Sequence, residues 1–305
     1  MDRGRDGVPA LTAGPELPRY VDLHSHSTAS DGERSPTGVA DAAHRAGLIA
    51  IALTDHDTLD GIPELLRAAS RIGLRVVSGC EFSVQAPWGE MHLLGYFLPP
   101  DSPALNQFLA DARAGRRERG RKMISRLQAL GVSVGFDELL EAAGGGAVGR
   151  PHVARALFRA GHVSSVNDAF DRYLGRGRPA YVEKELPTLR AVNDLVHGVG
   201  GVVSAAHLKD RGTRSVLRRF KEDGLDAVET RHPAHDGDQR ARLTSLALEL
   251  GLRRTGGSDW HGEDDTIGSH GFLGSQDVPL EWLDQLEAAR PAIHGTNGDD
   301  AGGQG

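Results

Sequence analysis

Short apolar segments alternate with amphipathic segments along most of the chain. The apolar segments are rich in Val, Ile, Leu and Ala and predict buried strands at 20–24, 48–54, 74–84, 91–98, 201–206, 225–230 and 252–258. Helical periodicity follows most of them, at 36–46, 60–72, 187–198, 212–223 and 236–250. Strands that alternate with helices indicate an α/β fold with a parallel sheet, and this number of units indicates a barrel.

One long segment interrupts this alternation. Residues 104–178 are mostly helical in pattern, with a flexible glycine-rich stretch at 142–149, and they carry 13 Lys and Arg against 7 Asp and Glu. This net charge of +6 in a chain of net −7 leaves −13 for the remainder. A basic helical insertion in an acidic body suits a lid over an anionic substrate, and the alternative is a solvated helical surface. The expected organisation is a barrel formed by 20–103 and 179–290, an insertion at 104–178, and flexible tails at 1–19 and 291–305.

Composition narrows the classes of function. A net charge of −7 does not favour nonspecific binding to long nucleic acid, and an aromatic content of 5% shows no stacking platform for long single strands. No apolar run approaches the roughly 18 residues of a membrane span, and the first residues lack a signal peptide. The single cysteine, Cys80, fits a reducing compartment. We therefore expect a cytoplasmic protein with no obligate protein partner.

Histidines and carboxylates gather where the predicted strands end. His24 and His26 follow the first strand in DLHSHSTASDG, and their spacing places both imidazoles on the same side of an extended segment. Asp31 follows in the adjoining loop, and His92 lies within the predicted strand 91–98. Other strands end in or are followed by Asp55, His56, Asp57, Glu81, His207, Asp259 and His261. The C-terminal ends of barrel strands converge on one face, so we expect most of these side chains to meet there. Such a pattern at six strand ends predicts a metal site.

The donor types restrict the metal. Imidazoles and carboxylates without a thiolate suit Mn, Fe or Zn and disfavour a structural zinc site. Seven or more donors exceed the needs of one tetrahedral ion, so two or three ions with a bridging carboxylate are expected. Asp57 and Asp60 suit helix capping and are left out of the ligand set, although Asp57 could instead orient a ligand histidine. The roles of His232 and His235, which follow a later strand, stay open.

The motifs HSHSTASDG, LTDHDT, SGCEFS and GGSDWHG, in this order, resemble the polymerase and histidinol phosphatase (PHP) superfamily. The run RPHVARAL at 150–157 is similar to its branch of nucleoside 3′,5′-bisphosphate phosphatases and the exonuclease RNase AM. The resemblance extends from about Tyr20 to His261 and includes the insertion. It implies a distorted, TIM-like (β/α)7 barrel with a helical insertion.

The resemblance also implies roles for the donors. His24, His26, Glu81 and Asp259 would hold one ion, and Glu81 would bridge to a second ion held by His92 and His207. Asp31, His56 and His261 would hold a third, with manganese preferred over iron or zinc. The catalytic set would be His24, His26, Asp31, His56, Glu81, Asp259 and His261. The family often has proline where this chain has Leu208, and proline is not a metal donor, so the ligand set is unaffected.

Arg150 and His152 in the RPH motif would contact substrate phosphate, since a guanidinium binds phosphate bidentately. The alternative is an ordinary helix start with Pro151 at its first turn. The implied reaction is removal of a phosphate from nucleoside 3′,5′-bisphosphates, such as adenosine 3′,5′-bisphosphate, and hydrolysis of short 5′-phosphorylated RNA, by a metal-activated hydroxide. Alternatives are a phosphatase for a non-nucleotide metabolite such as histidinol phosphate, or a non-catalytic PHP module. The RPH motif and the basic insertion favour nucleotides, and the complete donor set favours catalysis.

Overall fold

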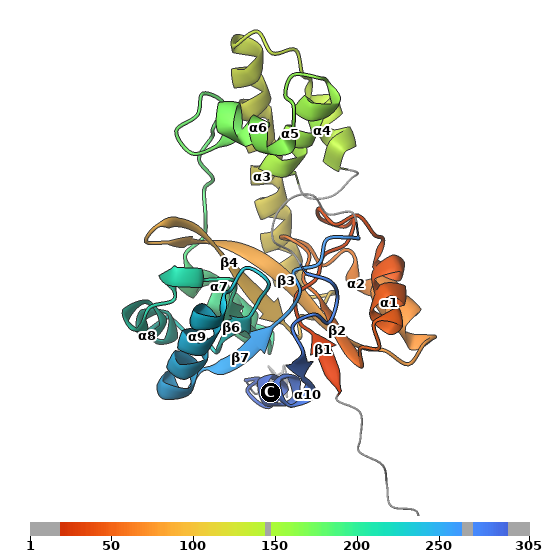
Figure 1. The fold of residues 1–305 in the computed structure, drawn as a ribbon, viewed down its shortest axis with the longest axis vertical. Helices are drawn as coiled ribbons and strands as arrows, with labels where there is room; N and C mark the ends of the chain where they lie inside the picture. Colours follow the sequence, from red (N-terminus) through yellow and green to blue (C-terminus); the bar gives the residue numbers. More distant parts are fainter. Residues whose placement is uncertain (1–18, 144–147, 264–270, 292–305) are drawn as a thin grey trace, which may run out of the picture.

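A computed structural model describes residues 19–143, 148–263 and 271–291, and its centre is an eight-stranded, nearly closed barrel (Figure 1). The strands lie in the order β7-β6-β5-β4-β3-β2-β1-β8. Their bounds are β1 (Tyr20–Asp22), β2 (Ala50–Leu53), β3 (Arg75–Ala86), β4 (Gly89–Tyr96), β5 (Val202–Ala205), β6 (Ala227–Arg231), β7 (Arg253–Gly256) and β8 (Val278–Pro279). The predicted α/β barrel is confirmed, with the short β8 as an additional strand.

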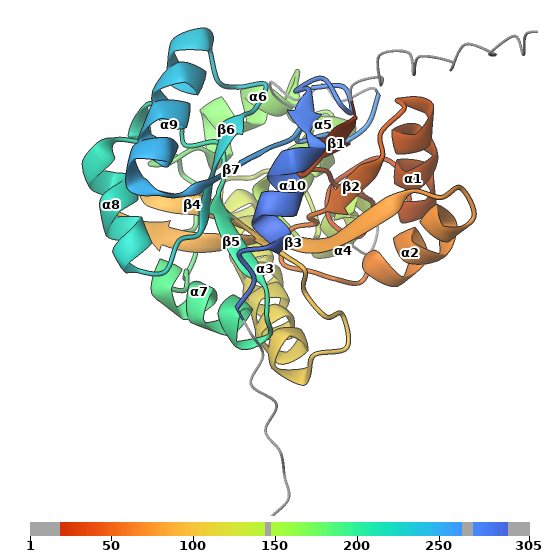
Figure 2. The same cartoon turned by 90° about the horizontal axis from the view of Figure 1, so that it is seen from below.

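Helices cover the outside of the barrel (Figure 1). They are α1 (Pro36–Arg45), α2 (Ile62–Ser70), α7 (Leu189–Gly198), α8 (Arg214–Glu222), α9 (Gly237–Leu250) and α10 (Leu280–Glu287). Ser35, Thr188 and Thr213 cap α1, α7 and α8, each side chain accepting a backbone N–H of the first turn. Seen from below, α10 crosses the end of the barrel, where Trp282 and Leu283 pack with Val21 (Figure 2). In the described ranges, no helix is both long and apolar enough to cross a membrane.

The first and last motifs close the barrel together. Leu23 N donates to Gly256 O (3.2 Å), Asp259 N to His24 O (2.8 Å) and His26 N to Trp260 O (2.8 Å). At Gly257 a Cβ atom would lie 2.4 Å from His24 N, so only glycine allows the two segments to approach this closely. The fold thereby places His24 and His26 beside Asp259.

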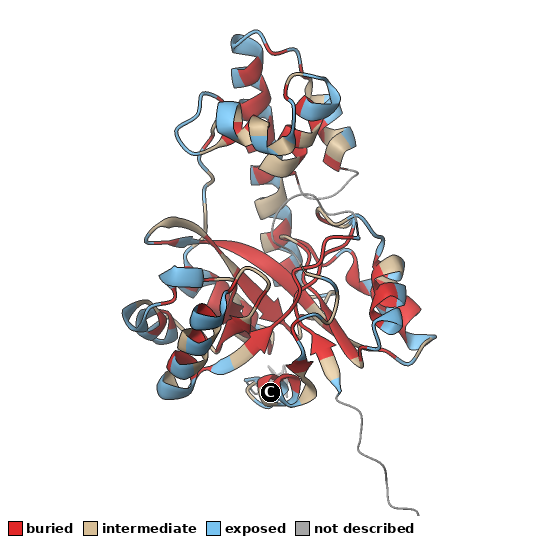
Figure 3. Cartoon of the chain, in the orientation of Figure 1, coloured by how far each residue is buried: buried red, intermediate tan, exposed pale blue. Residues whose placement is uncertain are grey.

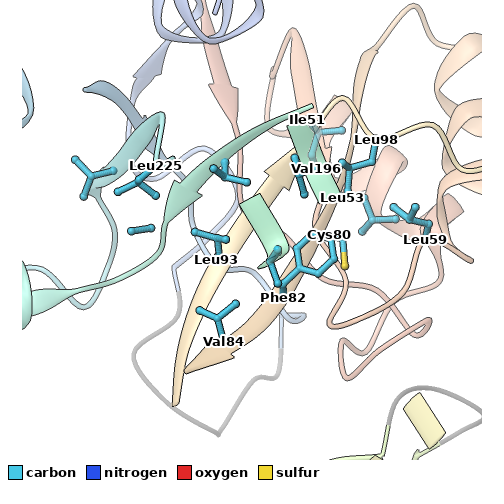
Figure 4. Packing of buried hydrophobic residues seen from close by; sticks show 14 of the residues in the cluster. Ile51, Leu53, Leu59, Cys80, Phe82, Val84, Leu93, Leu98, Val196 and Leu225 are labelled. Atoms are coloured by element: carbon cyan, nitrogen blue, oxygen red, sulfur yellow. The ribbon is translucent and has the colours of Figure 1, made fainter. Parts of the chain in front are cut away.

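One strand runs against the predicted direction. β4 is antiparallel to both β3 and β5, so the sheet is mixed rather than parallel. Only Pro87 and Trp88 separate β3 from β4, which makes a hairpin and leaves no room for a crossover helix. Phe82 and Val84 of β3 and Leu93 of β4 are fully buried against the helices on this side of the barrel (Figure 4).

The segment that interrupts the alternation forms α3 (Pro103–Ala129), α4 (Phe136–Ala143), α5 (Arg150–Arg159), α6 (Val166–Ala169) and a π-helical turn (Phe170–Leu174). These helices stand above the barrel and have a hydrophobic cluster of their own, which includes Met123, Leu127 and Leu157 (Figures 1 and 3). α3 is about 40 Å long and joins the two parts, because Leu105 and Leu109 belong to the barrel core. Nearly all of both predicted tails, and residues 144–147 of the glycine-rich stretch, lie outside the described residues.

Candidate metal centre

The nine predicted donors converge at the end of the barrel that faces the insertion. His24 Nε2 lies 3.2 Å from both Glu81 Oε2 and Asp259 Oδ1, and His26 Nε2 lies 3.1 and 3.2 Å from the same two oxygens. One ligand atom from each of these four residues lies within 4.8 Å of the others. This is the group that the resemblance implies for a first ion.

Glu81 stands between two sets of imidazoles. Its Oε2 faces His24, His26 and, at 3.4 Å, His56 Nδ1. Its Oε1 lies 2.8 Å from His92 Nδ1 and 3.1 Å from His207 Nε2. A carboxylate with one oxygen toward each set has the arrangement of a bridging ligand.

A further group gathers around Asp31. Its Oδ1 lies 3.4 Å from His261 Nε2 and its Oδ2 lies 3.8 Å from His56 Nε2, and His26 completes the group. The loop between His26 and Asp31 is held by Asp55, which accepts hydrogen bonds from Ser27 N, Ser27 Oγ and Ser30 Oγ, each at 2.7 Å. Asp55 therefore fixes the donors without being one of this group.

Both the chemical type of the donor atoms and their buried surroundings are suited to binding divalent ions. Among the described residues, His26 Nε2 and His56 Nδ1 are buried and receive no well-directed hydrogen bond, although carboxylate oxygens lie close to both. Burial lowers the pKa of His56 to about 3, which leaves its ring neutral and able to bind a cation. Burial opposes protonation of His26, but Asp259 and Glu81 outweigh it and raise its pKa to about 10. Imidazole nitrogens and carboxylate oxygens thus surround the same few positions, as expected where these atoms bind cations.

Two of the donors are presented by strained backbone. His207 and Asp259 have φ of 32° and 52°, in the left-handed region that costs a non-glycine residue about 1–3 kcal/mol. Asp57, at φ 49°, lies beside His56 in the same conformation. Strain of this kind persists where the surrounding structure enforces it, and here it coincides with the donor residues.

Glu229 completes the surroundings of the donors, and sequence reasoning missed it. Its Oε1 lies 3.0 Å from His24 Nδ1, and its Oε2 accepts a hydrogen bond from His207 N at 2.8 Å. The signal was present, because Glu229 lies near the C-terminal end of the predicted strand 225–230, as several other donors do in theirs. His232 Nε2 lies 3.3 Å from Asp259 Oδ2, whereas His235 accepts from Lys209 N and contacts its own loop. Of these two histidines, His232 is the one next to a donor.

We expect Glu229→Gln to weaken metal binding or turnover by about 10- to 100-fold, the usual effect of losing a carboxylate behind a ligand histidine. The substitution keeps the shape of the side chain but removes the charge that orients His24. Metal affinity from a competition titration and kcat would both be measured. Glu222→Gln on the exposed face of α8 is the matched control. Equal metal affinity and equal kcat in the two variants would contradict this role.

The capping roles predicted for Asp57 and Asp60 are wrong. The residue that precedes α2 is Gly61, without a side-chain cap, and Asp60 is largely exposed. Asp57 Oδ2 instead lies 2.6 Å from Arg116 Nε, and its Oδ1 accepts from Ser83 N at 3.3 Å. Burial would raise the pKa of Asp57, but Arg116 and Lys184 hold it below its usual value. Asp57 thus joins the barrel to α3 directly beside His56.

Arg150 and His152 lie at the start of α5. The Arg150 guanidinium is 30% exposed and 3.8 Å from Glu90 Oε2, between the rings of Phe170 and Tyr181. His152 is buried, and its Nδ1 accepts from Gly149 N at 3.0 Å, so this histidine also caps its own helix. Burial lowers the pKa of His152 to about 4, so the ring is neutral near pH 7. With Nδ1 as acceptor, the proton of the neutral ring is on Nε2.

A nearly closed α/β barrel with imidazoles and carboxylates gathered at one end defines a metal-dependent hydrolase. The chain belongs to the PHP domain family, whose model matches residues 22–228. It is 34% identical over 250 residues to a 5′-3′ exoribonuclease of Haemophilus influenzae, covering 80% of this chain and 91% of that protein. It is also 34% identical over 250 residues to a 3′,5′-nucleoside bisphosphate phosphatase of Chromobacterium violaceum, covering 79% and 87%. A solved structure from Bifidobacterium adolescentis, assigned as a metal-dependent phosphoesterase, superposes with a TM-score of 0.80 at 30% identity and covers 91% of this chain and 99% of that one.

Proposed function

We propose that this enzyme hydrolyses the 3′-phosphate ester of nucleoside 3′,5′-bisphosphates and the corresponding linkage at the 5′ end of short RNA. The observation that carries the proposal is a group of cations beside the donors. Lys184 Nζ lies 3.1 Å and Arg150 3.8 Å from the Glu90 carboxylate, which in turn lies 3.9 Å from His92 Nε2. A substrate with two phosphates matches a donor cluster bordered by fixed positive charge.

Positive charge is crowded in this region. Burial and Arg116 lower the pKa of Lys184 to about 8, and burial and Arg150 lower the pKa of Arg119 to about 10. Asp57 and Glu90 are the carboxylates that pair with this group. A bound phosphate would relieve the crowding, so anion binding here is favourable.

The two proposed substrates would undergo one reaction. A water oxygen bonds to the phosphorus on O3′ of a nucleoside that also carries a 5′-phosphate. The bond between phosphorus and O3′ breaks, and O3′ takes a proton. The products are a nucleoside 5′-monophosphate and either inorganic phosphate or an RNA chain that begins with a 5′-phosphate. The two substrates therefore differ only in what is attached to the scissile phosphorus.

Bound divalent ions, two or three by the number of donors and manganese by preference, would supply an activated water and neutralise the phosphate oxygens. The protein's own groups position the substrate. Arg150 and Lys184 would bind the 5′-phosphate that is not cleaved, through charge-assisted hydrogen bonds. His152, with its proton on Nε2, would donate a hydrogen bond to an oxygen of the same phosphate.

The test is phosphate or nucleotide release by the manganese-loaded protein. Adenosine 3′,5′-bisphosphate, AMP, 3′-AMP, histidinol phosphate and a 5′-phosphorylated dinucleotide would be compared at equal concentration. Preference for the bisphosphate and the dinucleotide, with AMP as a common product, is the expected result. Preference for histidinol phosphate, or no turnover of any of the five, would overturn the proposal.

Arg150→Ala is expected to raise KM for the bisphosphate by about 10- to 100-fold, the value of a hydrogen-bonded charged contact. KM for p-nitrophenyl phosphate, which has no second phosphate, should change by less than about threefold on the same reasoning. Arg159→Ala, at the exposed end of the same helix, is the matched control. Equal increases of KM for both substrates would show that Arg150 does not bind the second phosphate.

A further inference from the structure

A cavity of about 490 Å³ lies next to the metal centre, and Trp88, Lys209 and Arg211 in its lining have no part in the reaction described above. Its lining includes His92 and His207 together with Trp88, Arg150, Lys209 and Arg211. It lies between the tip of the β3–β4 hairpin and the segment that follows β5. Pockets of this volume bind small organic ligands, and one wall here consists of candidate metal donors.

The segment after β5 brings unpaired positive charge to the cavity. Lys209 and Arg211 are exposed, and neither forms an ion pair with any residue that the structure describes. Asp210 between them contacts α9 instead, through Gln239 Nε2 (3.1 Å) and Arg242 (3.5 Å). Arg242 also donates to Lys209 O at 2.8 Å, which fixes the segment. Glu90 and Asp210 also line the cavity, but they pair with Arg150, Lys184 and Arg242 rather than with the two cations, which leaves Lys209 and Arg211 to bind an anionic ligand.

The hairpin brings an aromatic ring to the same cavity. Trp88 is half-buried, its indole packs against Phe220 with ring centroids 6.1 Å apart, and the exposed Arg211 guanidinium lies over the ring at 5.4 Å from its centroid, a place that a stacked base would take over. Trp88 lies in the turn of the hairpin, four residues before His92, and both side chains line the same cavity. An aromatic ring with adjacent cations is the usual arrangement for binding single-stranded nucleic acid.

We propose that this cavity binds the nucleotide that follows the scissile phosphate of a short RNA substrate. Its base stacks on Trp88, and the next phosphate along the chain binds Lys209 and Arg211. The inference rests on the proposed function and extends it, because a nucleoside bisphosphate has no nucleotide beyond the scissile phosphate. The subsite therefore determines the preference for RNA over bisphosphate, although the low aromatic content predicted no stacking platform for long strands.

The test compares kcat/KM for a 5′-phosphorylated RNA trinucleotide with kcat/KM for adenosine 3′,5′-bisphosphate. Replacing Lys209 and Arg211 together with Ala should lower the trinucleotide-to-bisphosphate ratio by at least about tenfold, a typical effect of removing two phosphate contacts. Arg218→Ala with Arg219→Ala removes the same charge from the exposed face of neighbouring α8 and is the matched control. A ratio that is unchanged, or that falls equally in the control, would overturn the subsite.

Binding without turnover separates the subsite from the proposed reaction. A trinucleotide with a methylene group in place of the bridging 3′-oxygen should quench the fluorescence of Trp88 and bind about 5- to 150-fold more weakly to Trp88→Ala, the range for one stacked base. Trp88→Phe keeps an aromatic ring against Phe220 and should retain most of the affinity. Failure of the wild-type protein to hydrolyse any nucleotide would overturn the function. Equal affinity in wild type and Trp88→Ala would overturn the subsite whether or not hydrolysis occurs.

Discussion

Replacing Glu81 with Gln is expected to lower kcat for phosphate-ester hydrolysis by at least about 10³-fold, more than the 10- to 100-fold typical of a residue behind a ligand. Glu81 is the described side chain whose two oxygens face two different sets of histidines, His24 with His26 and His92 with His207. Glutamine has nearly the same shape, but it offers one oxygen and an amide N–H₂ that cannot bind a cation. One of the two sets must therefore lose its shared ligand.

Metal content should change together with activity. Elemental analysis after dialysis against manganese is expected to find fewer ions per chain in Glu81→Gln than in the wild type. Glu64→Gln is the matched control, because Glu64 is half-buried on α2 and accepts a hydrogen bond from Thr37 Oγ1, away from the metal centre. Full metal content and unchanged kcat in Glu81→Gln would show that this carboxylate does not join two ions.

The side chains that gather at the candidate metal centre could be predicted from the sequence because the rule that identifies them is geometrical. In a barrel, residues that directly follow the strands are brought to one face, and this applies to His24, His56 and Asp259 without any knowledge of their partners. The same rule pointed to Glu229, but a single glutamate without a motif gave no reason to choose it. The sequence also did not show that β4 reverses direction, since an apolar run carries no direction. The two-residue connection at Pro87 and Trp88 was the available signal.

The ion pair that Asp57 forms could not be predicted from the residues next to it in the sequence. An aspartate two residues before a turn suits a cap, and nothing nearby in the chain contradicts that interpretation. Its partner, Arg116, lies 59 positions later in a helix whose packing the sequence did not reveal. The arginines of α3 resemble an ordinary solvated face, yet Arg116 and Arg119 are buried and their neighbour Arg117 is exposed. Which of these arginines is buried and which is exposed depends on how α3 packs against the barrel, and the local sequence does not show this.

Arg116→Leu is therefore expected to lower the free energy of unfolding by about 3–5 kcal/mol, the usual cost of removing one partner of a buried ion pair. Arg116 Nε lies 2.6 Å from Asp57 Oδ2, and its NH2 group donates to Ser83 Oγ at 3.2 Å. Without the guanidinium, the buried Asp57 carboxylate keeps only Lys184, at 3.7 Å, as a nearby cation. Urea unfolding followed by circular dichroism would measure the change, with Arg117→Leu on the exposed side of α3 as the matched control.

The double variant Arg116→Leu with Asp57→Asn should recover part of this loss, because the asparagine no longer leaves a charge buried without its partner. An interaction energy of about 1–3 kcal/mol in the double-mutant cycle would assign the effect to this pair. Additive losses, or a free energy for Arg116→Leu within about 0.5 kcal/mol of the Arg117→Leu control, would contradict the assignment. Since Asp57 directly follows His56, the pair that attaches the insertion also fixes the backbone beside a proposed metal donor. A loss of stability at Arg116 should therefore be accompanied by a loss of activity, whereas the Arg117 control should show neither.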